Sequence, residues 1–201
     1  MTEPLAITSG HHTRVLASST DRVAWIRARS RGVTATDAAK LSGPAAVQQA
    51  VWDKLHGTRF TGSAYTEHGK AREPVIAEWV RSQHGFEPSS LLFHAEADRR
   101  HLATPDGIRE LDGGGIELCE IKTTAKSWRS IPRNYLRQVW WQQYVLGAER
   151  TLFVWEEHRD FQPISDVPEA RWIERDDAAI ADLIDLANRM LTALLRQGSH
   201  L

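Results

Sequence analysis

Three consecutive glycines, Gly113 to Gly115, constrain this chain more than any other feature, because with Asp112 they form a strong turn signal. The residues that follow, Ile116 to Thr123, alternate with the period of two that is typical of a β-strand. If this strand pairs antiparallel with the segment before the turn, Asp106 comes to lie beside Glu120. The sequence therefore predicts a hairpin with two carboxylates side by side.

The rest of the chain alternates between helical and extended patterns. We predict helices over residues 21–29, 45–55, 64–83 and 135–146 and after Asp176, and strands over residues 91–94, 100–104, 116–123, 151–156 and 171–174. Pro74 is expected to kink or break the third helix near Glu73. This order of elements predicts an α/β fold in which a central mixed β-sheet is flanked by helices.

The length and composition exclude several classes of protein. With 201 residues, of which 41% are hydrophobic, we expect one globular domain over 1–201 whose first 18 residues are flexible. The single cysteine, Cys119, excludes an internal disulfide, a four-cysteine zinc site and a cysteine-ligated iron–sulfur cluster. The chain has neither an apolar run that spans a bilayer nor a secretion signal, so we expect a cytoplasmic protein with no membrane partner.

Charge is segregated along the chain. The formal net charge of -1 argues against a protein that coats nucleic acid by charge alone. However, residues 22–36 carry four arginines and no acid, and residues 121–148 carry five basic residues and no acid. Residues 156–185 instead carry ten acids and three arginines. This pattern is typical of a protein with one anion-facing side, although clustered solvated helix faces would produce it as well.

The predicted hairpin carries groups that suit metal chemistry. Glu120 and Lys122 are two residues apart on a strand and therefore point to the same face. Two adjacent carboxylates, here Asp106 and Glu120, repel each other unless a cation lies between them, and Mg²⁺ prefers such oxygen ligands. An ammonium group nearby can stabilise the charge that develops on a phosphate. The spacing alone is equally typical of a surface hairpin with a glutamate–lysine pair.

Three further segments favour the metal interpretation. Glu73 at the expected helix kink can supply a third carboxylate, and Gln138 and Gln142 fall one turn apart on one helix face. The segment Arg31 to Asp37 places hydroxyl and backbone N–H groups at a helix start, which is an anion site. The nine histidines show no ligand spacing, so we expect no histidine metal site.

In this order the motifs Gly-Val-Thr-Ala-Thr, Gly-Lys-x-x-Glu, Thr-Pro-Asp-Gly, Glu-x-Lys and Tyr-x-x-Gln resemble the YqaJ-like viral recombinase family, which includes phage lambda exonuclease. This family belongs to the PD-(D/E)XK nucleases, so the resemblance implies a restriction-endonuclease-like core. It also implies Mg²⁺- or Mn²⁺-dependent digestion of linear double-stranded DNA from the 5′ end, with one or two metal ions. The 3′ single strand would pass to an annealing protein. A trimeric ring and a phage or prophage origin are further implications.

The resemblance also assigns residues. Glu73, Asp106, Glu120 and the carbonyl of Ile121 match the metal ligands, and Lys122 and Gln138 match the other catalytic positions. Thr36, Thr104 and either Arg29 or Arg31 match phosphate contacts. From the basic segment we add Lys126, Arg129 and Arg133 as DNA contacts. Whether Glu96 or Asp98 joins the metal site stays open, as do two alternatives: another PD-(D/E)XK DNA nuclease (RecB-like or an endonuclease), and a catalytically silent DNA-end-binding protein.

Overall fold

The computed structural model of the protein describes residues 10–57 and 63–198. Its larger sheet is built around β7 (Ile116–Thr124), which pairs antiparallel with β6 (Gly107–Glu110) and parallel with β8 (Arg150–Arg159). The strand order is β10-β8-β7-β6-β3, with β10 (Glu169–Glu174) and β3 (Glu87–Pro88) at the edges and β9 (Gln162–Pro163) paired to β8. The predicted hairpin is confirmed, because Gly107 lies opposite Cys119 and the backbone reverses at Gly114, whose φ is +83°.

A smaller sheet has the order β1-β4-β5-β2, formed by β1 (Val15–Ser18), β4 (Leu91–His94), β5 (His101–Ala103) and β2 (Val33–Thr34). Residues 10–18 therefore differ from the flexible segment expected there: His12–Arg14 form a 3₁₀ turn, and β1 pairs antiparallel with β4. The Arg14 guanidinium fixes this segment, because it donates hydrogen bonds to the carbonyls of His94, Val145 and Leu146. Residues 1–9 of the expected flexible segment lie outside the described residues.

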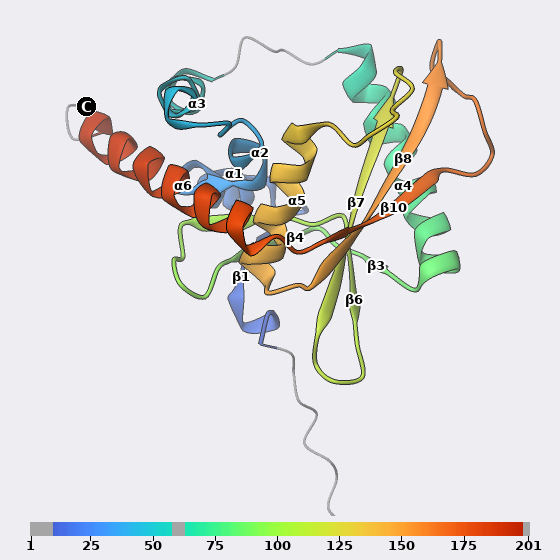
Figure 1. Ribbon diagram of the computed structural model, residues 1–201, viewed down its shortest axis with the longest axis horizontal. Coiled ribbons are helices and arrows are strands. Elements are labelled where there is room, and N and C mark those ends of the chain that lie inside the picture. Colours follow the sequence, from blue (N-terminus) through green and yellow to red (C-terminus); the bar gives the residue numbers. More distant parts are fainter. Residues whose placement is uncertain (1–9, 58–62, 199–201) are drawn as a thin grey trace, which may run out of the picture.

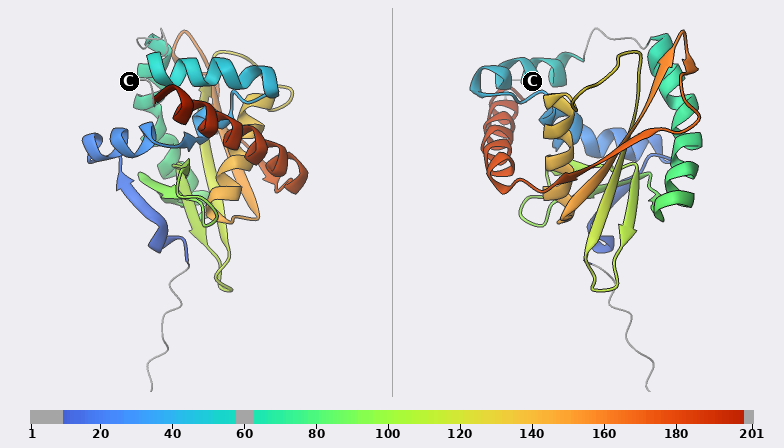
Figure 2. Two further views of the ribbon diagram at one scale, coloured as in Figure 1. Left: turned by 90° about the vertical axis from the view of Figure 1, so that its left-hand side faces the viewer. Right: turned by 45° about the vertical axis from the view of Figure 1, so that its right-hand side comes forward.

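Helices cover both faces of the larger sheet (Figures 1 and 2). Helix α4 (Ala64–His84) lies on one face and α5 (Arg133–Leu146) on the other, and α6 (Asp177–Gly198) packs outside α5 beside α3 (Pro44–His56). The side chains of β7 alternate accordingly: Cys119 and Ile121 pack in the core under α4, whereas Leu118 packs in the core that contains α5. Glu120 is two residues from Leu118 on the same strand, so its side chain points to the same face of the sheet, toward α5.

The break expected near Pro74 does not occur, because α4 continues from Ala64 to His84, whereas the kink expected as its alternative stays a prediction. A proline in a helix frees the carbonyl four residues earlier, here that of Lys70. Both Lys70 and Pro74 are exposed, so water can satisfy that carbonyl and the helix does not have to end. In the described part of the chain, no helix is long and apolar enough to cross a membrane.

Two short helices lie next to the smaller sheet. Helix α1 (Arg22–Ser30) precedes β2, and α2 (Ala35–Ala38) follows it directly. Thr34 caps α2, since its hydroxyl accepts a hydrogen bond from the Asp37 N–H at 3.3 Å and the Asp37 carboxylate accepts one from the Thr34 N–H at 2.8 Å. The helix start predicted near Thr36 is therefore present, and its cap is Thr34.

Candidate active site

The antiparallel pairing of β6 and β7 fixes Asp106 beside Glu120. The Asp106 N–H donates to the Cys119 carbonyl at 3.1 Å, which extends the ladder by one residue beyond β6. The Asp106 carboxylate accepts a hydrogen bond from the Ile121 N–H at 2.7 Å. The backbone of β7 therefore orients this carboxylate directly, as the hairpin predicts.

Glu120 is held by α5. Its side chain is 1% exposed. One carboxylate oxygen accepts hydrogen bonds from the Lys122 ammonium and from the Gln138 amide, and the other accepts one from the Gln142 amide at 2.7 Å. The two glutamines are one helical turn apart, so a single face of α5 fixes both oxygens.

Gln142 was not among the site residues predicted from the sequence. Its spacing of one helical turn from Gln138 is the signal that indicates it. The amide nitrogen that binds Glu120 also lies 3.4 Å from the carbonyl oxygen of Thr104. Gln142 is fully buried, and it contacts both segments that supply the neighbouring carboxylates. It therefore fixes Glu120 relative to the segment that leads into Asp106.

The third carboxylate, Glu73, comes from α4. Two contacts hold α4 against the ends of β7 and β8. Arg72 donates two hydrogen bonds, at 2.8 and 2.6 Å, to the buried carboxylate of Glu156. Gly69 packs so closely that a Cβ there would lie 3.4 Å from the hydroxyl of Thr123. Glu73 follows Arg72 directly and lies within electrostatic range of Glu120 and Lys122.

The electrostatics of this site show an excess of negative charge. Burial raises the pKa of Asp106 well above its usual value, and the charges of Glu120 and Glu73 raise it further, against the opposing effects of Lys122 and the Ile121 N–H. Burial and Glu120 likewise raise the pKa of Glu73, against the opposing effect of Lys122. Burial acts to lower the pKa of Lys122, but Glu120 and Asp106 outweigh it and raise that pKa.

Two carboxylates, those of Asp106 and Glu120, thus lie beside the ammonium group of Lys122, and the exposed Glu73 on α4 interacts with this cluster electrostatically. Each carboxylate that cannot be neutralised by Lys122 costs free energy when it is ionised in this partly buried site. A hard divalent cation relieves that cost, and carboxylate oxygens with a backbone carbonyl are the ligands it prefers. The donor set of Glu73, Asp106, Glu120 and the Ile121 carbonyl therefore fits Mg²⁺ or Mn²⁺.

A separate hollow lies at the start of α2. It has a volume of about 300 Å³, and its lining includes Arg29, Thr34, Thr36, Lys40 and Lys54. Arg29 is partly buried against it, and burial lowers the pKa of this guanidinium while the charge of Asp37 raises it. Arg31 is exposed and is not one of the lining residues. The geometry therefore favours Arg29 over Arg31 as the arginine of this hollow.

The remaining predicted DNA contacts occupy different positions. Thr104 lies next to the carboxylates, and its buried hydroxyl has no hydrogen-bond partner among the described residues. Lys126 is exposed and lines a cavity of about 600 Å³ with Thr123 and Thr124, at the end of β7. Arg129 is exposed in the loop between β7 and α5. Arg133, at the start of α5, lines another hollow, which lies between α5 and α6.

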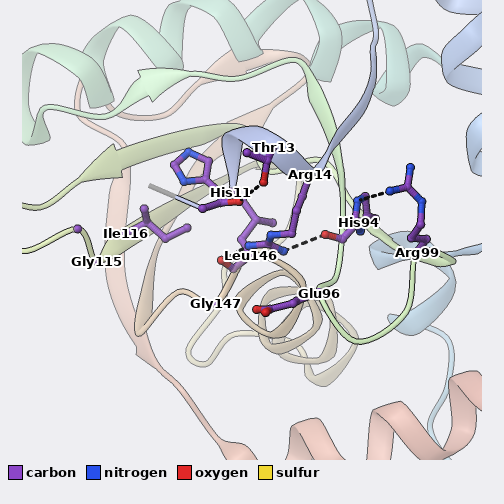
Figure 3. Close-up of a pocket in the computed structure, with 12 residues that line it drawn as sticks. His11, Thr13, Arg14, His94, Glu96, Arg99, Gly115, Ile116, Leu146 and Gly147 are labelled. Carbon is purple, nitrogen blue, oxygen red and sulfur yellow. Dashed lines mark hydrogen bonds between the residues drawn. The ribbon is translucent and has the colours of Figure 1, made fainter. Parts of the chain in front are cut away.

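The two acids whose role was open lie apart from the carboxylate cluster. Asp98 binds Arg100 through two hydrogen bonds, at 3.0 and 2.7 Å, and its pKa is lowered to about 2, chiefly by that arginine. Glu96 lines a cavity beside Arg14 (Figure 3). Neither acid is among the groups that shift the pKa of Asp106 or Glu73, so we place neither in the metal set.

A mixed sheet flanked by helices, with an aspartate and a Glu-x-Lys strand joined by a hairpin, is the PD-(D/E)XK fold. The family model of the YqaJ-like viral recombinase domain matches residues 24–149, and the chain therefore belongs to this family. The resemblance that the motifs indicate is confirmed.

Solved structures agree on the fold. An alkaline exonuclease from Laribacter hongkongensis (LHK-Exo) is 24% identical with a TM-score of 0.66, and the match covers 88% of this chain and 94% of that one. LHK-Exo in complex with dAMP is 22% identical with a TM-score of 0.65 over the same shares. A phage-related exonuclease from Haemophilus somnus 129PT is 13% identical with a TM-score of 0.61, over 83% and 96% of the two chains. A comparison with curated protein sequences gives no significant match.

Proposed function

We propose that this protein is a Mg²⁺-dependent exonuclease that digests linear double-stranded DNA from the 5′ end. The observation that carries the proposal is the placement of Asp106 and Glu120 side by side at Lys122, with Glu73 within electrostatic range. Membership of the YqaJ-like recombinase family supports a role in phage-type recombination, in which the 3′ strand passes to an annealing protein in the bacterial cytoplasm. A homo-oligomer, by resemblance a trimer, belongs to the same proposal.

Each group has a role in this reaction. Glu73, Asp106, Glu120 and the Ile121 carbonyl would hold one or two Mg²⁺ or Mn²⁺ ions, which supply Lewis-acid activation of water and phosphate. Lys122 stabilises the negative charge that grows on the scissile phosphate, because its pKa keeps it protonated. Gln138 holds Glu120 in place. The unpartnered Thr104 hydroxyl is available to donate a hydrogen bond to a phosphate oxygen.

The hollow at α2 suits a terminal 5′-phosphate. A terminal phosphate carries more charge than a phosphodiester, and it offers an additional oxygen to cationic and hydroxyl donors. Arg29 and Thr36 line this hollow and give it such donors, whereas Lys54 and Lys40 are paired there with Asp37 and Asp53. A phosphate bound there would hold the strand end in register with the metal site, so that attack falls on the next phosphodiester.

The test compares linear duplexes with 5′-phosphate and 5′-hydroxyl ends and a covalently closed circle, each with Mg²⁺ and with EDTA. We expect rapid digestion of the phosphorylated duplex, slower digestion of the hydroxyl duplex, no cleavage of the circle and no activity in EDTA. Arg29→Ala should reduce the preference for phosphorylated ends, whereas Arg31→Ala, the matched exposed arginine, should change it less.

Each alternative function predicts a different result. Efficient cleavage of the circle would identify an endonuclease. Binding to ends without cleavage, at any Mg²⁺ or Mn²⁺ concentration, would identify a silent end-binding protein. Equal rates on both kinds of end would exclude the terminal-phosphate site, and equal effects of the two arginine variants would remove the assignment to Arg29.

A further inference from the structure

Outside the carboxylate cluster, the structure brings two adjacent histidines together with a glutamate that is distant in the sequence. His11 and His12 precede β1, and Glu110 is the last residue of β6. The Nε2 atom of His12 lies 2.7 Å from Oε1 of Glu110, and the Nε2 atom of His11 lies 3.6 Å from the same oxygen. One ligand atom from each of the three side chains lies within 4.8 Å of the others. The histidine spacing gave no sign of this group, because its acid comes from another strand.

Local structure explains why the two adjacent histidines reach the same oxygen. His11 has helical backbone angles, with φ −71° and ψ −31°, and it immediately precedes the 3₁₀ turn of His12–Arg14. The two imidazole rings therefore lie on the same side, with centroids 4.1 Å apart and an angle of 34° between their planes. In an extended strand, consecutive side chains would point to opposite faces.

The ligand positions are fixed by packing on both sides. His11 is 3% exposed, and its ring lies 5.8 Å from that of Phe93 in β4. Arg14 ties the same turn to the end of α5, and Figure 3 shows His11 next to Ile116, at the edge of the cavity that Arg14 also lines. Glu110 pairs with Ile116 in the β6–β7 ladder. His12 and Glu110 are exposed, so an ion can enter from solvent.

The donor set distinguishes this group from the carboxylate cluster. Two imidazole nitrogens and one carboxylate oxygen suit a borderline ion such as Zn²⁺, whereas three carboxylates suit Mg²⁺. Three protein ligands leave the fourth tetrahedral position of Zn²⁺ for water.

We propose that His11, His12 and Glu110 form a second metal site, selective for Zn²⁺ over Mg²⁺, that cross-links the N-terminal turn to the β6–β7 hairpin. Glu110 lies at the opposite end of β6 from Asp106, so the two sites are separate. The cross-link joins residues 98 apart in the chain, and it would stabilise the folded state because the unfolded chain does not preform the site.

The experiment titrates metal-free protein with Zn²⁺ by isothermal calorimetry in excess Mg²⁺, and records the melting temperature at each step. We expect one equivalent of Zn²⁺ to bind and the melting temperature to rise. Loss of a hydrogen-bonding partner of a ligand typically costs roughly 10- to 100-fold in metal affinity, so His12→Ala and Glu110→Gln should each cost at least that. Co²⁺ in place of Zn²⁺ should give the visible spectrum of a tetrahedral site.

Two control variants make the result specific. His56→Ala removes an exposed histidine that stacks on Trp52 in α3, and it should leave Zn²⁺ affinity unchanged. Asp106→Asn should also leave it unchanged, which separates this site from the carboxylate cluster even if the proposed nuclease function fails. Unchanged affinity in both His12→Ala and Glu110→Gln would overturn the proposal, as would a lack of Zn²⁺ binding in excess Mg²⁺.

Discussion

Two buried glutamates of β7 differ in how their charge is compensated. Glu117 is 2% exposed and Glu120 is 1% exposed, and they lie three residues apart on the same strand. Glu117 accepts hydrogen bonds from two arginines, at 2.6 Å from Arg150 and 2.8 Å from Arg109, and both guanidinium groups lie over the ring of Trp172. Burial acts to raise the pKa of Glu117, but the two arginines outweigh it and lower that pKa.

Glu120 lies in the opposite situation. It shares a single lysine with Asp106 and Glu73, and the pKa values of both neighbouring carboxyl groups are raised. One buried acid is therefore neutralised by the protein itself, and the other belongs to a cluster that an external cation would neutralise. Burial of an acid alone does not indicate a metal site. The balance of charge around it does.

The largest expected effect is on catalysis. Glu120→Gln and Asp106→Asn should each reduce cleavage of linear duplex to background, because each removes a proposed metal ligand while keeping the shape of the side chain. Glu117→Gln is the matched control on the same strand and should retain cleavage per folded molecule. Activity of Asp106→Asn at the parent rate would show that the site is elsewhere.

Lys122→Ala should lower turnover by roughly 10² to 10³, the usual loss for a group that stabilises charge in the transition state. DNA affinity should change little, and excess Mg²⁺ should not restore the rate. Arg129→Ala and Arg133→Ala should show the reverse: each should weaken DNA binding and leave turnover little changed. In each variant, the slope of log binding constant against log salt concentration should become shallower by about one. Single-turnover rates and binding isotherms separate the two cases, and a Lys122→Ala protein with poor binding but normal turnover would exchange these roles.

The sequence predicted the hairpin, the Glu-x-Lys strand and the long helices, because turn signals and periodicity are local. It did not predict β1, β2, β3 or β9, which have two to four residues each and depend on pairing with other strands. Likewise, Glu117 and Glu120 look alike in the sequence. Their difference depends on Arg150 from β8 and on the amides of α5, which only the fold brings to them. The group of His11, His12 and Glu110 was missed for the same reason.

A smaller effect is expected from Gln142, which positions Glu120. Gln142→Leu should weaken Mg²⁺-dependent activity by roughly 10- to 100-fold, the range for a partner that orients a metal ligand, and higher Mg²⁺ should partly restore the rate. Gln143→Leu is the matched control, because this equally buried amide binds Thr151 and the carbonyl of Ile173 away from the site. If both variants shift the Mg²⁺ dependence equally, Gln142 has only a packing role.

The last expected effect is on stability, and the two regions should respond with opposite sign. A carboxyl group whose pKa is raised in the folded state stabilises the fold when it is protonated, and this contribution is lost as pH rises toward the folded pKa. In EDTA, Asp106→Asn should therefore raise the free energy of unfolding, and more at pH 8 than at pH 5. Asparagine is chosen over alanine because its side-chain oxygen can still accept a hydrogen bond from the Ile121 N–H.

Glu117 has a lowered folded pKa, so its contribution to stability is present above its unfolded pKa and is lost as pH falls toward the folded pKa. Glu117→Gln should therefore cost about 1–3 kcal/mol at pH 8, because two arginines lose their charged partner. Urea unfolding of the parent and both variants at the two pH values measures these changes. A loss of stability in Asp106→Asn at pH 8 would show that Lys122 alone already compensates the cluster, so that Glu120, like Glu117, lies where the protein itself balances the charge.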